Sequence, residues 1–137
     1  MDRKELQELA RLRLREAKAL AAAGLPGGAY YLAGYAVECA LKACIAKATR
    51  RHEFPDKARA YASHTHDLSG LVKLALLEGF LRDLARADGE FDQNWGIVKL
   101  RSEKSRYQTF GPEEARVLIK AIADRRHGVL PWVARHW

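Results

Sequence analysis

Cysteine is scarce in this sequence, and its placement excludes two common roles. The two cysteines, Cys39 and Cys44, lie five positions apart in one apolar stretch. On a helix this spacing turns the side chains to different faces, so that a disulfide between them is hard to form. They form no CxxC motif, and none of the five histidines stands at a zinc-ligand spacing from them. We therefore expect two buried free thiols and no metal site.

Long apolar runs are missing as well. The longest apolar stretch is interrupted by Glu38 and Lys42, so it lacks the unbroken length of a membrane span. The first residues, MDRKE, lead into charged amphipathic sequence and not into the apolar region of a secretion signal. The sequence thus predicts a cytoplasmic protein that does not enter membranes.

The composition that is present is typical of a globular protein. Of 137 residues, 48% are hydrophobic and 30% are charged, and this length suits one domain covering residues 1–137. The net charge of +7 is unevenly distributed. Residues 67–98 carry six acidic and three basic side chains, whereas residues 99–137 carry nine basic and four acidic ones. A basic C-terminal region of this kind is compatible with a polyanionic partner.

Apolar residues recur at helical spacing along most of the chain, and glycine and proline separate the segments. The segment 29–49 is apolar on every side, which predicts a central helix surrounded by others. We expect helices over residues 2–23, 29–49, 68–78, 80–87, 91–105 and 112–122, with Asp67 as a cap and Gly79 as a break. No segment alternates as a strand does. The sequence therefore predicts an all-α fold, an antiparallel up-and-down bundle of four to five main helices.

Four features in order resemble a known family. Residues 31–43, YLAGYAVECALKA, look like the second helix of HEPN domains, which are named for higher eukaryotes and prokaryotes nucleotide-binding. The later features that agree in order are His66-Asp67-Leu68 with Leu71, then Trp95 with Arg106-Tyr107, and last the segment 112–122 running into VLPWV at 129–133. The resemblance covers roughly residues 5–133 and identifies a HEPN-like helical domain.

This resemblance implies a homodimer that is often encoded beside a minimal nucleotidyltransferase in toxin–antitoxin or defence modules. It also implies binding of nucleotide or RNA, without a cofactor or a metal. Many HEPN proteins are metal-independent endoribonucleases whose motif is an arginine, four to six residues and a histidine. In such a site histidine accepts the proton of a 2′-hydroxyl, and arginine offsets the charge that develops on the phosphate.

The sequence departs from the ribonuclease motif in its late helical region. At the expected distance from Arg101 stand Tyr107 and Gln108 instead of histidine. Tyrosine, with an ordinary pKa of about 10, is a poor base at neutral pH. The motif spacing occurs instead at Arg59 and His64, between the second and third predicted helices. Two interpretations follow, a catalytic Arg59/His64 pair or a coincidence of spacing.

Several cationic and aromatic residues are candidates for nucleotide or RNA binding. Arg101, Lys104, Arg106 and Tyr107 combine three cations with a ring that can stack on a base. The alternative is a solvated basic face. His66 is a further candidate for ligand contact, although Asp67 can cap the next helix with His66 closing the loop.

Arg13 stands out because it falls inside the apolar arc of the first helix. A cation there needs an anionic partner. One interpretation pairs it with Glu38, the lone acid of the central helix, and the other places it in an anion site between helices. Glu38 and Lys42 also form an i,i+4 pair in the favourable order.

These features favour a homodimeric binding and assembly module that acts on nucleotide or RNA beside a nucleotidyltransferase. The alternatives are a metal-independent ribonuclease toxin and a non-catalytic helical scaffold. The sequence leaves open whether the protein is an enzyme.

Overall fold

The structure is a computed structural model that describes residues 1–51, 64–101 and 107–137, and the described residues form helices without a strand. This confirms the predicted all-α class. The helices in chain order are α1 (Arg3–Ala22), α2 (Pro26–Arg51), α4 (Leu68–Leu74), α5 (Glu78–Ala87), α6 (Gly89–Val98), α7 (Pro112–Ala123) and α8 (Val129–Ala134). The described part of the chain therefore has more and shorter helices than the four to five expected.

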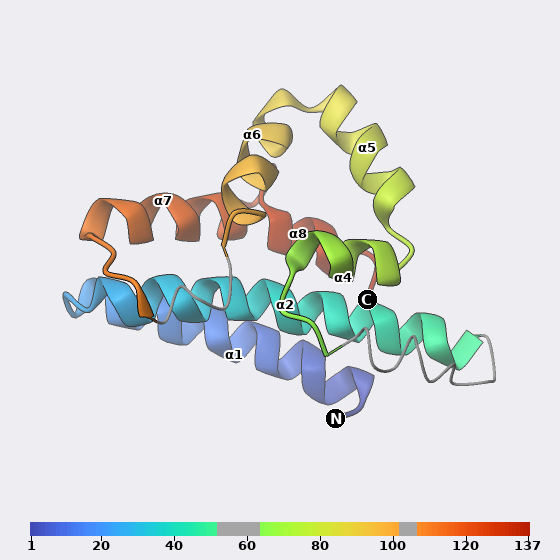
Figure 1. The fold of residues 1–137 in the computed structure, drawn as a ribbon, viewed down its shortest axis with the longest axis horizontal. Coiled ribbons are helices and arrows are strands. Elements are labelled where there is room, and N and C mark those ends of the chain that lie inside the picture. Colours follow the sequence, from blue (N-terminus) through green and yellow to red (C-terminus); the bar gives the residue numbers. More distant parts are fainter. Residues whose placement is uncertain (52–63, 102–106) are drawn as a thin grey trace.

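The long helices α1 and α2 form an antiparallel pair at the base of the molecule (Figure 1). A capping box begins α1, because Glu5 N donates to Asp2 Oδ1 and Asp2 N donates to Glu5 Oε2, both at 2.8 Å. After α1 the chain turns at Gly24, whose φ of 78° is the left-handed conformation that glycine adopts without steric cost. The prediction of a helix over 2–23 is confirmed to within a residue at each end.

Helix α2 is the centre of the fold, as predicted. It lies between α1 on one side and α4, α7 and α8 on the other. In Figure 1, α7 runs in the same direction as α2, so the up-and-down alternation seen for α1 and α2 does not extend to α7. α2 begins at Pro26, three residues before the predicted start, because proline fits a first helical turn, where its missing N–H has no partner to lose. Its fully buried residues include Ala33, Val37, Ala40 and Leu41.

The break between α4 and α5 lies at Leu76, and the predicted break at Gly79 is wrong. Asp67 caps α4 as expected, by accepting from Gly70 N at 3.3 Å. Leu76 then adopts a φ of 63°, while Leu77 N donates to Val72 O and Leu76 N donates to Lys73 O. This is a Schellman helix end with leucine at the position where glycine is favoured. The left-handed conformation costs a non-glycine residue roughly 1–2 kcal/mol.

The C-terminal helices close the upper side of the core. Asp88 caps α6, which ends at Val98; the prediction carried that helix to Ser105, which lies outside the described residues. α7 starts at Pro112 as predicted. The segment after Gly128, for which no helix was predicted, is the short helix α8, which buries Trp132 against Phe91 with the ring centroids 5.3 Å apart.

Both cysteines are free and buried within this core, as the sequence predicted. Among the helices of the described ranges, none combines the length and the apolar character needed to cross a membrane.

Candidate functional site

The most unusual feature of the interior is a buried carboxylate, Glu38, halfway along α2. Its side chain is 1% exposed, although its helix is otherwise lined with alanine, valine, leucine and cysteine. A buried carboxylate is stable only when cations or hydrogen-bond donors surround it. Lys42, His66 and Arg101 do so here, and together with Glu38 we call them the Glu38 cluster.

Three separate segments supply the partners of Glu38. His66 Nδ1, just before α4, lies 2.8 Å from Glu38 Oε1. Arg101 Nη1, after the end of α6, lies 3.5 Å from the same oxygen. Lys42 Nζ, one turn further along α2, lies 3.5 Å from Oε2. One carboxylate thus faces two permanent cations and one histidine that can be protonated.

Arg101 is the most deeply buried cation of the cluster, with 1% of its side chain exposed. Nη2 donates to the Tyr31 carbonyl oxygen at 2.9 Å, and the guanidinium lies 5.0 Å from the centroid of the Tyr31 ring. Burial lowers the pKa of Arg101, and the nearby Glu38 carboxylate acts in the opposite direction. Nε and Nη1 have no hydrogen-bond partner among the described residues. The pair is therefore held by charge at 3.5 Å rather than by a complete hydrogen-bond network.

Gly34 provides the space in which Arg101 lies. A Cβ atom at this position of α2 would overlap Nε, Cδ and Cγ of the Arg101 side chain. Glycine in a helix interior normally destabilises by roughly 0.5–1 kcal/mol relative to alanine. At Gly34 that loss accompanies the close approach of a buried guanidinium to the helix backbone.

The Glu38–His66 contact sets what the imidazole can do chemically. When the Nδ1–H group donates a hydrogen bond to the carboxylate, the neutral ring carries its free lone pair on Nε2. Nε2 is then the nitrogen that can accept a proton. The His66 side chain is 40% exposed and that of Lys42 is 24% exposed. These two residues therefore form the solvent-facing side of the cluster, whereas Glu38 and Arg101 form its interior.

The structure brings together two of the predicted binding residues, His66 and Arg101. The alternative of a solvated basic face is wrong for Arg101, because its side chain is buried against α2. Its predicted role in binding stays a prediction. Tyr107 is 78% exposed, and His64 is exposed too. The remaining candidates lie outside the described residues; these are Arg59, Lys104 and Arg106.

Arg13 does not join the cluster, and the predicted Arg13–Glu38 pair is wrong. Arg13 instead pairs with Glu16, one turn along α1, and its guanidinium lies 5.9 Å from the centroid of the Tyr35 ring. Tyr35 precedes Glu38 by about one helical turn, so Arg13 meets the neighbouring turn of α2. The partners of the glutamate come instead from α2 itself, from the residues before α4 and from the end of α6.

A second histidine–carboxylate pair lies elsewhere, between the α5–α6 and α7–α8 connections. His127 Nδ1 is 2.6 Å from Asp88 Oδ2, and His127 Nε2 is 3.3 Å from Glu90 Oε2. The hydrogen bond to Asp88 raises the pKa of His127, although partial burial acts against it. Asp88 also caps α6, so this pair ties a helix start to the loop before α8. Sequence analysis did not single it out.

The comparisons with known proteins leave the cluster as the main guide to function. No family model matches the chain, and neither a curated protein nor a solved structure matches it.

Proposed function

We propose that this protein is a HEPN-like homodimeric module that binds nucleotide or RNA beside the Glu38 cluster. In this proposal it works with a minimal nucleotidyltransferase in a toxin–antitoxin or defence module. The observation that carries the binding proposal is the meeting of His66 and Arg101, from separate segments, on one glutamate of α2. The other parts of the proposal, which are the HEPN family, the homodimer and the nucleotidyltransferase partner, rest on the resemblance of the sequence to HEPN domains.

The charges of the cluster suit an anionic ligand. Lys42 and Arg101 outnumber the single carboxylate of Glu38, so the cluster is net positive even with His66 neutral. Charged groups held in a partly buried site attract phosphate more strongly than the same groups in open solvent. Lys42 and His66 are the members within reach of a ligand, and buried Arg101 acts by adding charge and fixing Glu38.

Binding can be tested by titrating a labelled single-stranded RNA oligonucleotide and ATP in separate experiments. Lys42→Gln removes the partly exposed cation of the cluster and keeps a polar side chain beside Glu38. We expect it to weaken RNA binding severalfold. The slope of the logarithm of the binding constant against the logarithm of the salt concentration should become shallower by about 0.7, the contribution of one phosphate contact in a single strand. Lys120→Gln on the exposed face of α7 is the matched control and should leave both quantities unchanged. Equal affinity of wild type and Lys42→Gln for both ligands contradicts the proposed binding surface.

A ribonuclease is the second candidate, favoured by the 2.8 Å contact between Glu38 and His66. A carboxylate on Nδ1 holds the imidazole in one orientation and one tautomer, as in triads in which histidine is the general base. His66 would then take the proton of a 2′-hydroxyl through Nε2, and the 2′-oxygen would attack the adjacent phosphorus while the bond from phosphorus to the 5′-oxygen breaks. The leaving 5′-oxygen would take a proton from water, which gives a cyclic phosphate and a free 5′-hydroxyl. The Arg59/His64 pair is the competing catalytic hypothesis.

Incubation of the protein with RNA in EDTA separates these alternatives. Cleavage to cyclic-phosphate ends that is lost in His66→Ala but kept in His64→Ala supports the Glu38-oriented base. The opposite pattern supports Arg59/His64. Intact RNA together with saturable binding identifies a binding module, whereas intact RNA without binding identifies a scaffold. Light scattering coupled to gel filtration tests the homodimer, and a monomer contradicts that part of the proposal.

A further inference from the structure

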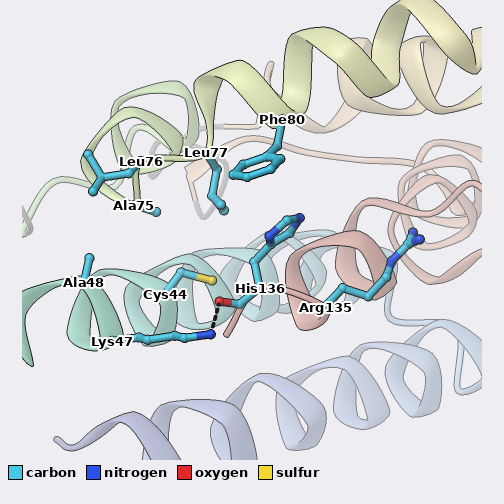
Figure 2. A pocket seen from close by; sticks show the side chains of 9 residues that line it. All are labelled: Cys44, Lys47, Ala48, Ala75, Leu76, Leu77, Phe80, Arg135 and His136. Atoms are coloured by element: carbon cyan, nitrogen blue, oxygen red, sulfur yellow. Dashed lines mark hydrogen bonds between the residues drawn. The ribbon is translucent and has the colours of Figure 1, made fainter. Parts of the chain in front are cut away.

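A pocket lies further along α2, beside Cys44, Lys47 and Ala48, and none of its lining residues belongs to the Glu38 cluster. Its volume is about 290 Å³. Figure 2 shows the α4–α5 turn and Phe80 on one side, with α2 and the end of α8 on the other. This volume is at the lower end of the roughly 300–1,000 Å³ found for ligand pockets. The space therefore suits a molecule of one or two rings.

The floor and one wall of the pocket are apolar. Ala75 and Leu77 are buried there beside Cys44, whose thiol donates to the Val133 carbonyl at 3.7 Å. Burial raises the pKa of Cys44 to about 12, so the thiol is neutral and contributes an uncharged surface. The Phe80 ring, which is 57% exposed, lies 4.9 Å from the His136 ring at a tilt of 40°. The two rings form an aromatic wall that leaves Phe80 open to further contact.

The polar side of the pocket is positive. Lys47 Nζ donates to the His136 carbonyl oxygen at 3.4 Å, and Figure 2 shows it beside Cys44, while the Arg135 side chain extends away. The lining residues include no carboxylate. Among the described residues, neither Lys47 nor Arg135 takes part in an ion pair. Lys47 is therefore a cation with no counter-charge among the residues that the structure describes, at the edge of an apolar cavity.

The pKa of His136 is affected by the same positive charges. Burial lowers its pKa, and the neighbouring charges of Arg135 and Lys47 lower it further. Its imidazole is therefore neutral at neutral pH and serves as an aromatic surface. An anion bound next to Lys47 would offset the two positive charges.

The turn that borders the pocket keeps an unfavourable backbone conformation. Leu76, with a φ of 63°, is 57% exposed at the rim, and it directs the following Leu77 into the core. Strained residues of this kind persist where the surrounding structure holds them, and they are common at binding sites. The strain agrees with a functional pocket but does not identify the ligand.

We propose that this pocket binds a small aromatic carboxylate, with its ring against Phe80 and His136 and its carboxylate on Lys47. The single positioned cation matches one negative charge, and the apolar floor excludes a strongly hydrated polyanion such as a triphosphate. An aromatic body gains contact area on the exposed Phe80 face that a free inorganic anion cannot use. This inference is independent of the nucleotide- or RNA-binding proposal.

The full-length chain can be titrated with phenylacetate, 2-phenylethanol and inorganic phosphate while backbone amide shifts are followed by NMR. Phenylacetate should shift resonances of Lys47, Leu77, Phe80 and His136 saturably, at concentrations below about 10 mM. The neutral alcohol should bind about tenfold more weakly, because it lacks the charge-assisted hydrogen bond to Lys47. Phosphate should not saturate these resonances.

Two variants separate the charge from the aromatic wall. Lys47→Gln should weaken phenylacetate about tenfold and leave the alcohol unchanged, whereas Phe80→Ala should weaken both ligands. Lys120→Gln serves again as the control and should bind like wild type, and circular dichroism confirms that each variant is folded. The proposal is overturned by an absence of saturable shifts, by shifts confined to other residues, by equal affinity for the alcohol, or by equal affinity for phosphate.

Discussion

His66 with Glu38 and His127 with Asp88 are chemically the same pair, an imidazole Nδ1 on a carboxylate, at 2.8 and 2.6 Å. Their surroundings differ. Glu38 is 1% exposed and draws on Lys42 and Arg101 as well, whereas Asp88 is 20% exposed and is assisted by its backbone contact with α6. Solvent replaces the additional cations at the surface, because water screens the charge. The burial of the carboxylate, and not the histidine contact itself, decides how many further cationic side chains the fold must place beside it.

The largest effect is expected from breaking the buried pair. Glu38→Leu leaves Arg101 as an uncompensated buried charge, and we expect it to lower the free energy of unfolding by about 3–5 kcal/mol. Arg101→Met should be milder, because Glu38 keeps His66 and Lys42. In urea unfolding, the double variant should lose less than the two single losses combined. Additivity within about 0.5 kcal/mol would show that the two residues are not coupled.

The next effect tests whether Arg101 needs the space that Gly34 provides. Gly34→Ala places a methyl group on the Arg101 side chain, so we expect a loss of about 1–3 kcal/mol from overpacking. Gly96→Ala is the matched control in α6, where a Cβ would meet nothing within 4 Å. It should stabilise by about 0.5–1 kcal/mol, the usual helix preference for alanine. If thermal unfolding shows both variants stabilised, Arg101 is not confined as the structure describes.

Breaking the less buried His127–Asp88 pair should have the smallest effect on the free energy of unfolding, and that effect should depend on pH. The pKa of His127 is raised in the folded protein by its hydrogen bond to Asp88. Its contribution to stability is therefore full below the ordinary histidine pKa of about 6.5 and is lost as pH rises through the raised value. His127→Gln should lower the urea midpoint at about pH 5.5 and match wild type more closely at about pH 9.

A second surface pair provides the control for this pH dependence. Glu113 and Arg116 are 72% and 61% exposed, so Glu113→Gln should leave the urea midpoint unchanged at both pH values. A pH-independent loss in His127→Gln would mean that the histidine contributes by packing alone. The surface pair would then no longer be an electrostatic counterpart of the buried one.

Local patterns in the sequence were sufficient for much of the fold. The helical class, the central position of α2 and the start of α7 at Pro112 follow from periodicity and from backbone preferences that act over one or two turns. Leu76 shows the limit of this reasoning. Glycine favours a chain break, so local sequence places the break at Gly79. In the structure the turn lies at Leu76 instead, where it brings Leu77 into the core.

The candidate site could be predicted only in part from the sequence, for a similar reason. Arg13, a cation inside an apolar arc, indicated that an anion must lie nearby, and Glu38 was one of two interpretations of that anion. A helical wheel shows which face a side chain occupies but not which distant segment covers that face, so it paired Glu38 with Arg13 and did not reveal Arg101 as its partner.

The sequence by itself thus determined the all-α class, the central position of α2 and the buried thiols, because each depends on residue type and short-range spacing. Only the tertiary structure decided that His66 and Arg101 meet that carboxylate, and that Lys47, Phe80 and His136 surround one pocket. His66 lies 28 positions from Glu38, and Lys47 lies 89 from His136. Contacts over such separations are set by how whole helices pack, since packing buries the apolar faces together and charges are then paired within the remaining space.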